Sequence, residues 1–104
     1  MNEDPSDILA RETQAFEDQA QVEARRARER DDFRWLMGHA QGRRIVWRYL
    51  ASCGVFHSSF STEALVMAKK EGRREVGLQL LDDVMTHTPL AYPKMMEEAG
   101  KAPE

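Results

Sequence analysis

Polar residues dominate the first third of the chain. Residues 7–32 are rich in Ala, Glu, Gln and Arg, which are good helix formers. The apolar residues there are few and form no continuous stripe: Ile8, Leu9, Phe16 and Val22. A helix that is polar nearly all round bridges solvent or is unstable alone. We therefore predict that residues 1–32 form a polar, acidic helical arm that docks weakly and has a frayed start, with Asp4 or Ser6 as its N-cap and Pro5 in the first turn.

Helical periodicity of apolar residues begins at Phe33, and Gly38 is expected to end the first short apolar face. The next helix is predicted from Gly42 to Ser52, followed by Gly54 as a stop signal. Its expected buried face contains five residues: Ile45, Val46, Tyr49, Leu50 and Cys53.

Two further helices follow in the pattern. Ser61 or Thr62 is expected to cap a helix that runs to Thr86 or breaks near Gly72, with a broad apolar face: Val76, Leu80, Leu81, Val84 and Met85. The last helix is expected to start at Pro89 or Pro93, to dock through Tyr92, Met95 and Met96, and to end at Gly100. Because no run alternates like a strand, the prediction is an all-α fold. It is a small bundle of about four helices, with residues 33–104 as the compact domain.

One short phrase occurs twice, 30 residues apart. Five of nine positions match between Gly42-Arg-Arg-Ile-Val-Trp-Arg-Tyr-Leu50 and Gly72-Arg-Arg-Glu-Val-Gly-Leu-Gln-Leu80. Residues at i, i+4 and i+8 form one row along a helix. We therefore predict that two rows pack against each other as structural contacts: Gly42, Val46 and Leu50 on one helix, and Gly72, Val76 and Leu80 on the other.

Charge is divided unevenly along the 104 residues. Residues 1–32 hold ten acids and five arginines, whereas residues 33–104 hold eight acids and ten bases, and residues 33–62 hold no acid. Such asymmetry indicates either an anionic partner or an acidic segment that folds back on a basic one, and we favour the second slightly. No apolar run approaches the length of a membrane span, and the acidic N-terminus is not typical of a secretory signal.

Candidate chemistry is sparse. Cys53 and His57 lie four residues apart, but Gly54 interrupts the helix between them, and one Cys with one His is half of a zinc site. As the only cysteine, Cys53 cannot form an intrachain disulfide. The acidic pairs at 82–83 and 97–98 are interpreted as solvated helix surface. We expect no catalytic residues, metal or cofactor.

Arginines and aromatic residues give the one plausible contact surface. Arginine binds phosphate and aromatic rings stack on bases, which would suit nucleic acid. The contact candidates for a partner or for nucleic acid are Arg43, Arg44, Trp47, Arg48, Arg73 and Arg74. We favour a structural role for the two Gly-Arg-Arg segments, with arginine stems over apolar side chains and heads paired with acids.

Four motifs in order resemble a family of small tailed-phage proteins typified by a Bordetella podovirus protein. They are Asp32-Phe-Arg-Trp-Leu-Met37, Gly42-Arg-Arg-Ile-Val-Trp-Arg48, Gly54-Val-Phe-His-Ser-Ser-Phe60 and Glu71-Gly-Arg-Arg-Glu-Val-Gly-Leu-Gln-Leu-Leu81. The resemblance covers about residues 31–99 and leaves out the arm.

The resemblance implies a product of the virion-structure region of a phage genome. The expected function is a non-enzymatic structural or assembly protein of the head, the portal vicinity or the internal contents. Expected partners are other virion proteins such as portal, capsid or ejection proteins. A second copy of the chain is a further candidate partner. The expected location is the virion, and the host cytoplasm during assembly. The alternative is a nucleic-acid-binding accessory factor in DNA packaging.

Overall fold

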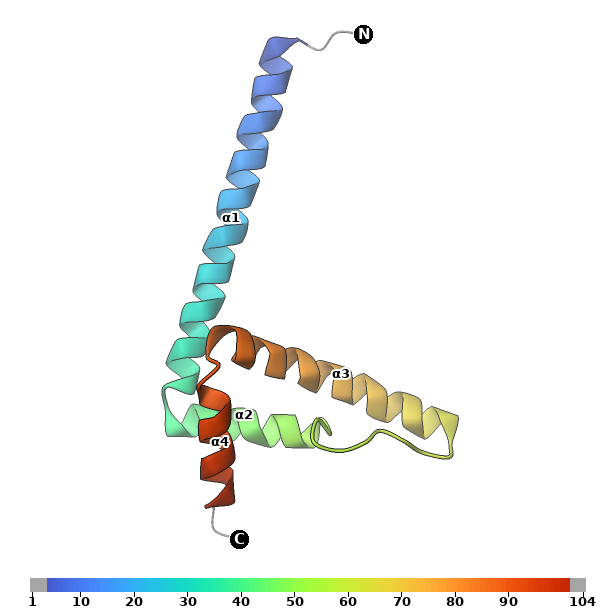
Figure 1. The fold of residues 1–104 in the computed structure, drawn as a ribbon. Helices are drawn as coiled ribbons and strands as arrows, with labels where there is room; N and C mark the ends of the chain where they lie inside the picture. Colours follow the sequence, from blue (N-terminus) through green and yellow to red (C-terminus); the bar gives the residue numbers. More distant parts are fainter. Residues whose placement is uncertain (1–3, 102–104) are drawn as a thin grey trace. The chain divides into compact units, whose positions relative to one another are not determined.

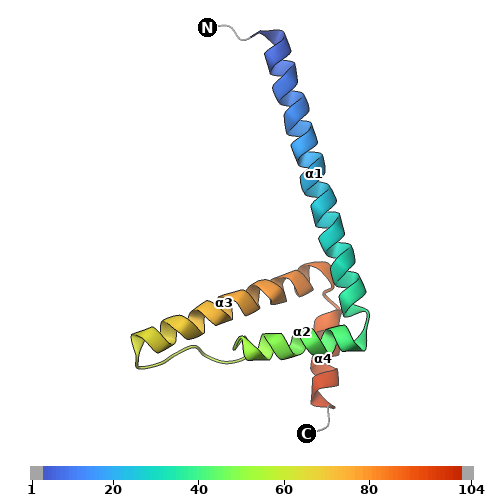
Figure 2. The ribbon, with the colours of Figure 1, turned by 180° about the vertical axis from the view of Figure 1, so that it is seen from behind.

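The computed structural model describes residues 4–101, and all of their regular structure is helical. The helices are α1 (Pro5–Met37), α2 (Ala40–Ser52), α3 (Ala64–His87) and α4 (Ala91–Gly100) (Figures 1 and 2). The predicted all-α fold is confirmed. The chain divides into two units, Met1–Asp31 and Asp32–Glu104, so that most of α1 belongs to the first and its last turns to the second.

Asp4 starts α1. Its Oδ1 accepts a hydrogen bond from the backbone N–H of Ser6 at 3.1 Å, and Pro5 takes the first helical position, where no N–H is needed. This hydrogen bond from Ser6 lowers the pKa of the Asp4 carboxyl. The predicted frayed start falls largely on residues 1–3, which lie outside the described residues.

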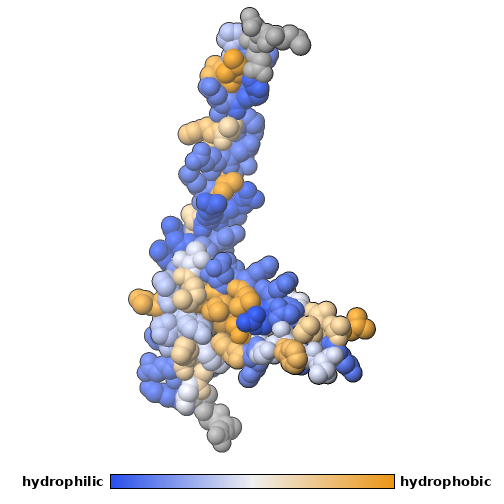
Figure 3. Space-filling view, turned by 45° about the vertical axis from the view of Figure 1, so that its right-hand side comes forward, coloured by the Kyte–Doolittle hydropathy of each residue, from blue (hydrophilic) through white to orange (hydrophobic). Residues whose placement is uncertain are grey.

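The first unit is a polar helix supported by contacts along its own surface. Side-chain hydrogen bonds join Gln14 to Asp18 at 2.9 Å and Gln19 to Glu23 at 3.3 Å, both four residues apart. The large apolar side chains on it are exposed, including Phe16 at 73 %. Its surface in Figure 3 is accordingly mostly hydrophilic, with isolated apolar spots.

The second unit packs three helices and the end of α1 around a small core. α2 and α3 run antiparallel and side by side, and α4 crosses α2 (Figures 1 and 2). The buried apolar residues come from every element: Met37, Val46, Leu50, Val84 and Met95. Phe33 near the end of α1 stacks on His87 at the end of α3, with ring centroids 5.5 Å apart.

The buried face of α2 is narrower than predicted. Val46 and Leu50 are buried, but Ile45 and Tyr49 are 46 % and 54 % exposed. The buried line instead passes through Gly42, Arg43 and Val46 to Leu50. The long side chain of Arg43 is therefore part of the buried line, which the pattern of apolar residues did not predict.

Gly54 ends α2 as predicted. Its φ is +76°, which an L side chain rarely adopts. The Gly54 N–H bonds the carbonyl of Ala51, and the Val55 N–H bonds that of Leu50, which together form a Schellman motif.

The second copy of the repeated phrase does not form the predicted row. Val76 is 61 % exposed, and a Cβ added at Gly72 would meet no atom within 4 Å. The close approach of α3 to α2 occurs at Gly77, where a Cβ would lie 2.6 Å from the Cβ of Cys53. Leu80 is half-buried against the core, so it is the one member of the predicted row that packs inward. The row of α3 residues that faces α2 therefore lies further along the helix than the predicted row, and on a different side of it.

Three predicted helix boundaries are wrong. α2 begins at Ala40, two residues before the predicted Gly42. Glu63, rather than Ser61 or Thr62, is the N-cap of α3, and its N–H bonds the Ser61 hydroxyl. α4 begins at Ala91, after Leu90. Pro93 stands at its third position, within the first turn, where helical N–H groups have no partner inside the helix.

Candidate docking groove and basic pocket

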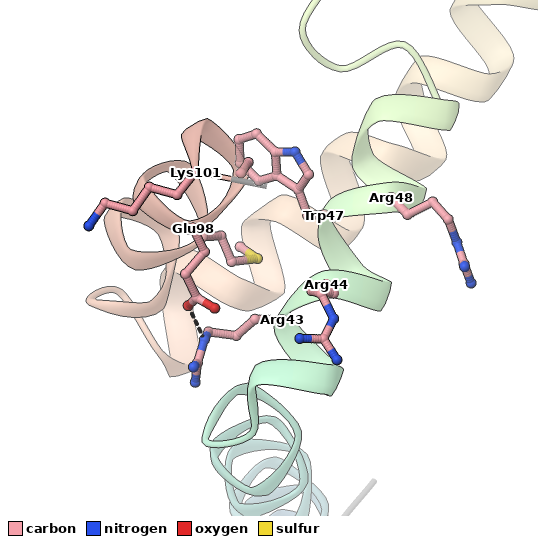
Figure 4. A pocket seen from close by; sticks show the side chains of 8 residues that line it. Arg43, Arg44, Trp47, Arg48, Glu98 and Lys101 are labelled. Carbon is pink, nitrogen blue, oxygen red and sulfur yellow. Dashed lines mark hydrogen bonds and ion pairs between the residues drawn. The ribbon is translucent and has the colours of Figure 1, made fainter. Parts of the chain in front are cut away.

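A groove of about 490 Å³ lies between α2 and α4. We call it the docking groove and define it by its lining residues: Arg43, Arg44, Trp47, Arg48, Met95, Glu98, Ala99 and Lys101 (Figure 4). Met95, Ala99 and the Trp47 ring supply apolar surface, while arginine and lysine side chains surround it. It is therefore a hydrophobic hollow with a predominantly cationic border.

Arg43 closes the inner side of this groove and is 8 % exposed. Its Nε donates to Oε1 of Glu98 at 2.5 Å, and its Nη1 donates to the carbonyl oxygen of Met37 at 2.8 Å. Figure 4 shows the side chain directed toward Glu98. Arg43 thus joins the end of α1, α2 and α4. Its Nε and Nη1 are therefore engaged within the fold, which supports a structural role, and contact of Arg43 with a partner stays a prediction.

Trp47 forms the aromatic wall of the groove. Its ring centroid lies 4.8 Å from that of Phe56 and 6.4 Å from that of Tyr92, so three rings from α2, the following loop and α4 cluster together. Trp47 is half-buried and keeps part of its surface toward the groove. It serves both core and groove.

The remaining cations of the groove lie on exposed surface. Figure 4 shows the guanidinium groups of Arg44 and Arg48 on the side of α2 away from α4. Arg48 also approaches the Tyr49 ring at 5.6 Å. On α4, Lys101 pairs with Glu97 at 2.9 Å, but both side chains are at least 65 % exposed, so the pair adds little stability. These three cations are available to a partner.

Arg73 and Arg74 line a different pocket. They lie with Lys70 on α3, and the pocket of about 230 Å³ reaches the end of α2 and the loop after it. We call it the basic pocket, lined by Ser52, Cys53, Gly54, His57, Ser58, Ser59, Lys70, Arg73 and Arg74. The first Gly-Arg-Arg segment instead lines the docking groove at the beginning of α2. The structure therefore does not gather the two segments into one cluster of four arginines.

Glu98 and Lys101 were not predicted to line a groove. The acidic pair at 97–98 is typical of solvated helix surface, and no motif marked Lys101. Glu98 follows Met95 by three residues, which places it on the same face of a helix. That spacing was the signal that Glu98 lies beside a buried residue. Gly77 was also missed, although it stands within the repeated phrase.

Within residues 4–101 no helix is long and apolar enough to cross a membrane. No three His, Cys, Asp or Glu residues in that range lie close enough together to hold a metal ion. Cys53 and His57 share the basic pocket, where no metal set forms around them.

The model of the Bbp19-like phage protein family matches residues 33–97, well over half of the chain. The chain belongs to this family. The match lies within the second unit and includes α2, α3 and most of α4, together with most of the docking groove. The predicted resemblance to a phage family is confirmed, and the arm lies outside the match. No curated protein and no solved structure matches the chain.

Proposed function

We propose that this phage protein is a non-enzymatic component of the virion or of its assembly, which binds another virion protein in the docking groove. The observation that carries the proposal is the pairing of an apolar floor with a cationic border on a member of a phage family. It acts in the particle and, during assembly, in the host cytoplasm. The head, the portal vicinity and the internal contents are the candidate positions.

The occupant that fits best is a short acidic amphipathic helix of the partner. A helix laid in a groove buries an apolar face and leaves its polar flanks at the rim. Here the face would contact Met95, Ala99 and the Trp47 ring, while acidic flanks would meet Arg44, Arg48 and Lys101. Glu98 would not repel such a helix strongly, because its carboxylate is neutralised by Arg43.

The test is incorporation into particles. Phage carrying the wild-type chain should contain it when purified particles are analysed by mass spectrometry. The double variant Arg48→Glu with Lys101→Glu reverses charge at the rim and leaves the buried contacts intact. We expect its copy number per particle to fall by about tenfold, since like charges across an interface suppress association.

A matched control changes the same amount of charge elsewhere. The double variant Lys70→Glu with Arg73→Glu alters two exposed cations of the basic pocket and should leave incorporation unchanged. Absence of the wild-type chain from particles would exclude a virion component and leave an assembly factor, and equal incorporation of the two double variants would contradict binding in the docking groove.

A further inference from the structure

The side chains that line the basic pocket carry positive charges and no balancing negative charge. Its lining includes Lys70, Arg73 and Arg74 and no acidic residue. These three positions are spaced by three and four residues on α3, so their charges lie on one side of the helix and repel one another. An arrangement of this kind is stabilised when an anion lies among the cations.

The acid nearest to the cluster is already engaged. Glu71 accepts a hydrogen bond from the Ser59 hydroxyl, and the Nη1 of Arg74 lies 3.9 Å from its Oε1. The Nε of Arg74 is buried and has no hydrogen-bond partner within residues 4–101. Buried polar atoms normally have a partner, so the described residues leave this donor unsatisfied.

The end of α2 does not supply that acceptor charge. The carbonyls at a helix C-terminus carry about half a negative charge in total, which is much smaller than three full positive charges. Those of Leu50 and Ala51 are also bonded to the N–H groups of Val55 and Gly54.

The other lining groups suit a tetrahedral oxyanion. Ser58 places a hydroxyl group in the pocket beside the three cations, whereas the Ser59 hydroxyl already donates to Glu71. Guanidinium groups donate to phosphate oxygens in pairs, and hydroxyl groups add further donors. In both ribbon views the loop between α2 and α3 runs beside the first half of α3, and residues of both line the pocket (Figures 1 and 2).

We propose that the basic pocket binds a phosphate group. Two sources share this chemistry, namely free phosphate and the backbone of a nucleic-acid strand. Phe60 is 74 % exposed and directly follows the pocket residue Ser59, which provides a ring on which a base can stack. The site is separate from the docking groove and does not depend on it.

The experiment uses the full chain at low ionic strength with two probes. One is inorganic phosphate, followed by changes in amide NMR shifts, and the other is a short fluorescent single-stranded oligodeoxynucleotide, followed by anisotropy. The double variant Lys70→Gln with Arg73→Gln removes two exposed cations and should weaken binding at least about tenfold. The control Arg48→Gln removes one exposed cation of the docking groove and should change affinity by less than about twofold.

The two probes distinguish the source. Binding of the oligonucleotide that weakens with salt and with Phe60→Ala identifies a nucleic-acid strand, whereas shifts with inorganic phosphate alone identify free phosphate. The proposal is overturned if neither probe binds, or if Arg48→Gln weakens binding as much as the pocket variant. Far-UV circular dichroism of each variant verifies that the helices are intact, and failure here would leave incorporation through the docking groove unaffected.

Discussion

The two copies of the repeated phrase have nearly opposite environments. In the first copy, Gly42, Arg43, Val46 and Leu50 are all buried. In the second, Gly72 is open, Arg73 and Val76 are exposed, and only Leu80 packs against the core. The same residue types at the same spacing therefore contribute very differently to stability.

The cause lies in what surrounds each copy. α2 is enclosed by the end of α1, by α3 and by α4, so a whole line of its residues is buried. Among the described residues, it is the loop after α2 that lies beside the first half of α3 (Figure 1). A glycine followed by arginines predicts where a helix could be approached closely, and the neighbouring elements decide whether it is.

The largest difference is expected at the glycines. A Cβ at Gly42 would lie 2.0 Å from the carbonyl oxygen of Leu36, which is backbone and cannot rotate away. Gly42→Ala should therefore lower the free energy of unfolding by about 3 kcal/mol. Urea denaturation followed by tryptophan fluorescence measures this loss. An unchanged midpoint would show that the corner between α1 and α2 is not closely packed.

The next largest difference in stability is expected between the arginines of the two copies. Arg43→Met removes the donors to Glu98 and to the Met37 carbonyl, and should cost about 2 kcal/mol. This loss of stability is smaller than for a fully buried ion pair because the side chain of Glu98 is 32 % exposed. Arg73→Met, at the matching position of the second copy, should stay within about 0.5 kcal/mol. Thermal melts of both variants test the difference, and equal losses would refute it.

Truncation of the two valines to alanine should show a similar difference in the free energy of unfolding. Val46 is 4 % exposed, so Val46→Ala removes two buried methyl groups and should cost about 2 kcal/mol. Val76→Ala should have almost no effect, because the side chain is 61 % exposed and alanine favours helix. Chemical denaturation of the pair gives the comparison. A larger loss for Val76→Ala would mean that the face of α3 bearing Val76 is covered in solution.

The substitution at Gly72 should have a small effect on stability, of the opposite sign. Gly72 lies inside α3 with no neighbour near its Cβ position. Gly72→Ala should stabilise the chain by about 0.5–1 kcal/mol, because alanine loses less backbone entropy in a helix. A rise in the melting temperature by differential scanning calorimetry would confirm it, while a fall would indicate that the repeated phrase does mark a close approach there.

Local signals in the sequence predicted the fold class and several helix ends. Gly54 predicted the end of α2, Asp4 and Pro5 predicted the start of α1, and the order of motifs indicated the phage family. These features depend on residues close together in the chain. For the same reason the sequence predicted Val46 and Leu50 as core residues of α2 but could not exclude Ile45 and Tyr49.

The sites needed information that no local pattern holds. The repeat predicted a contact at Gly72, whereas the contact is at Gly77, because the register between α2 and α3 is set by the loop between them. Arg43 and Glu98 are 55 residues apart, and nothing in either neighbourhood identifies the other as its partner. Arg44, Trp47 and Arg48 were proposed as contacts on composition, and their role there stays a prediction.

The guanidinium of Arg43 donates hydrogen bonds both to Glu98, which borders the groove, and to the carbonyl of Met37 at the end of α1. An acidic guest of the groove that competes with Glu98 for Arg43 would alter how that arginine is shared, and so change how strongly the last turn of α1 is held. By reciprocity, loosening that turn shifts affinity for the guest by an equal free energy. The groove and the end of α1 are consequently coupled through a single residue.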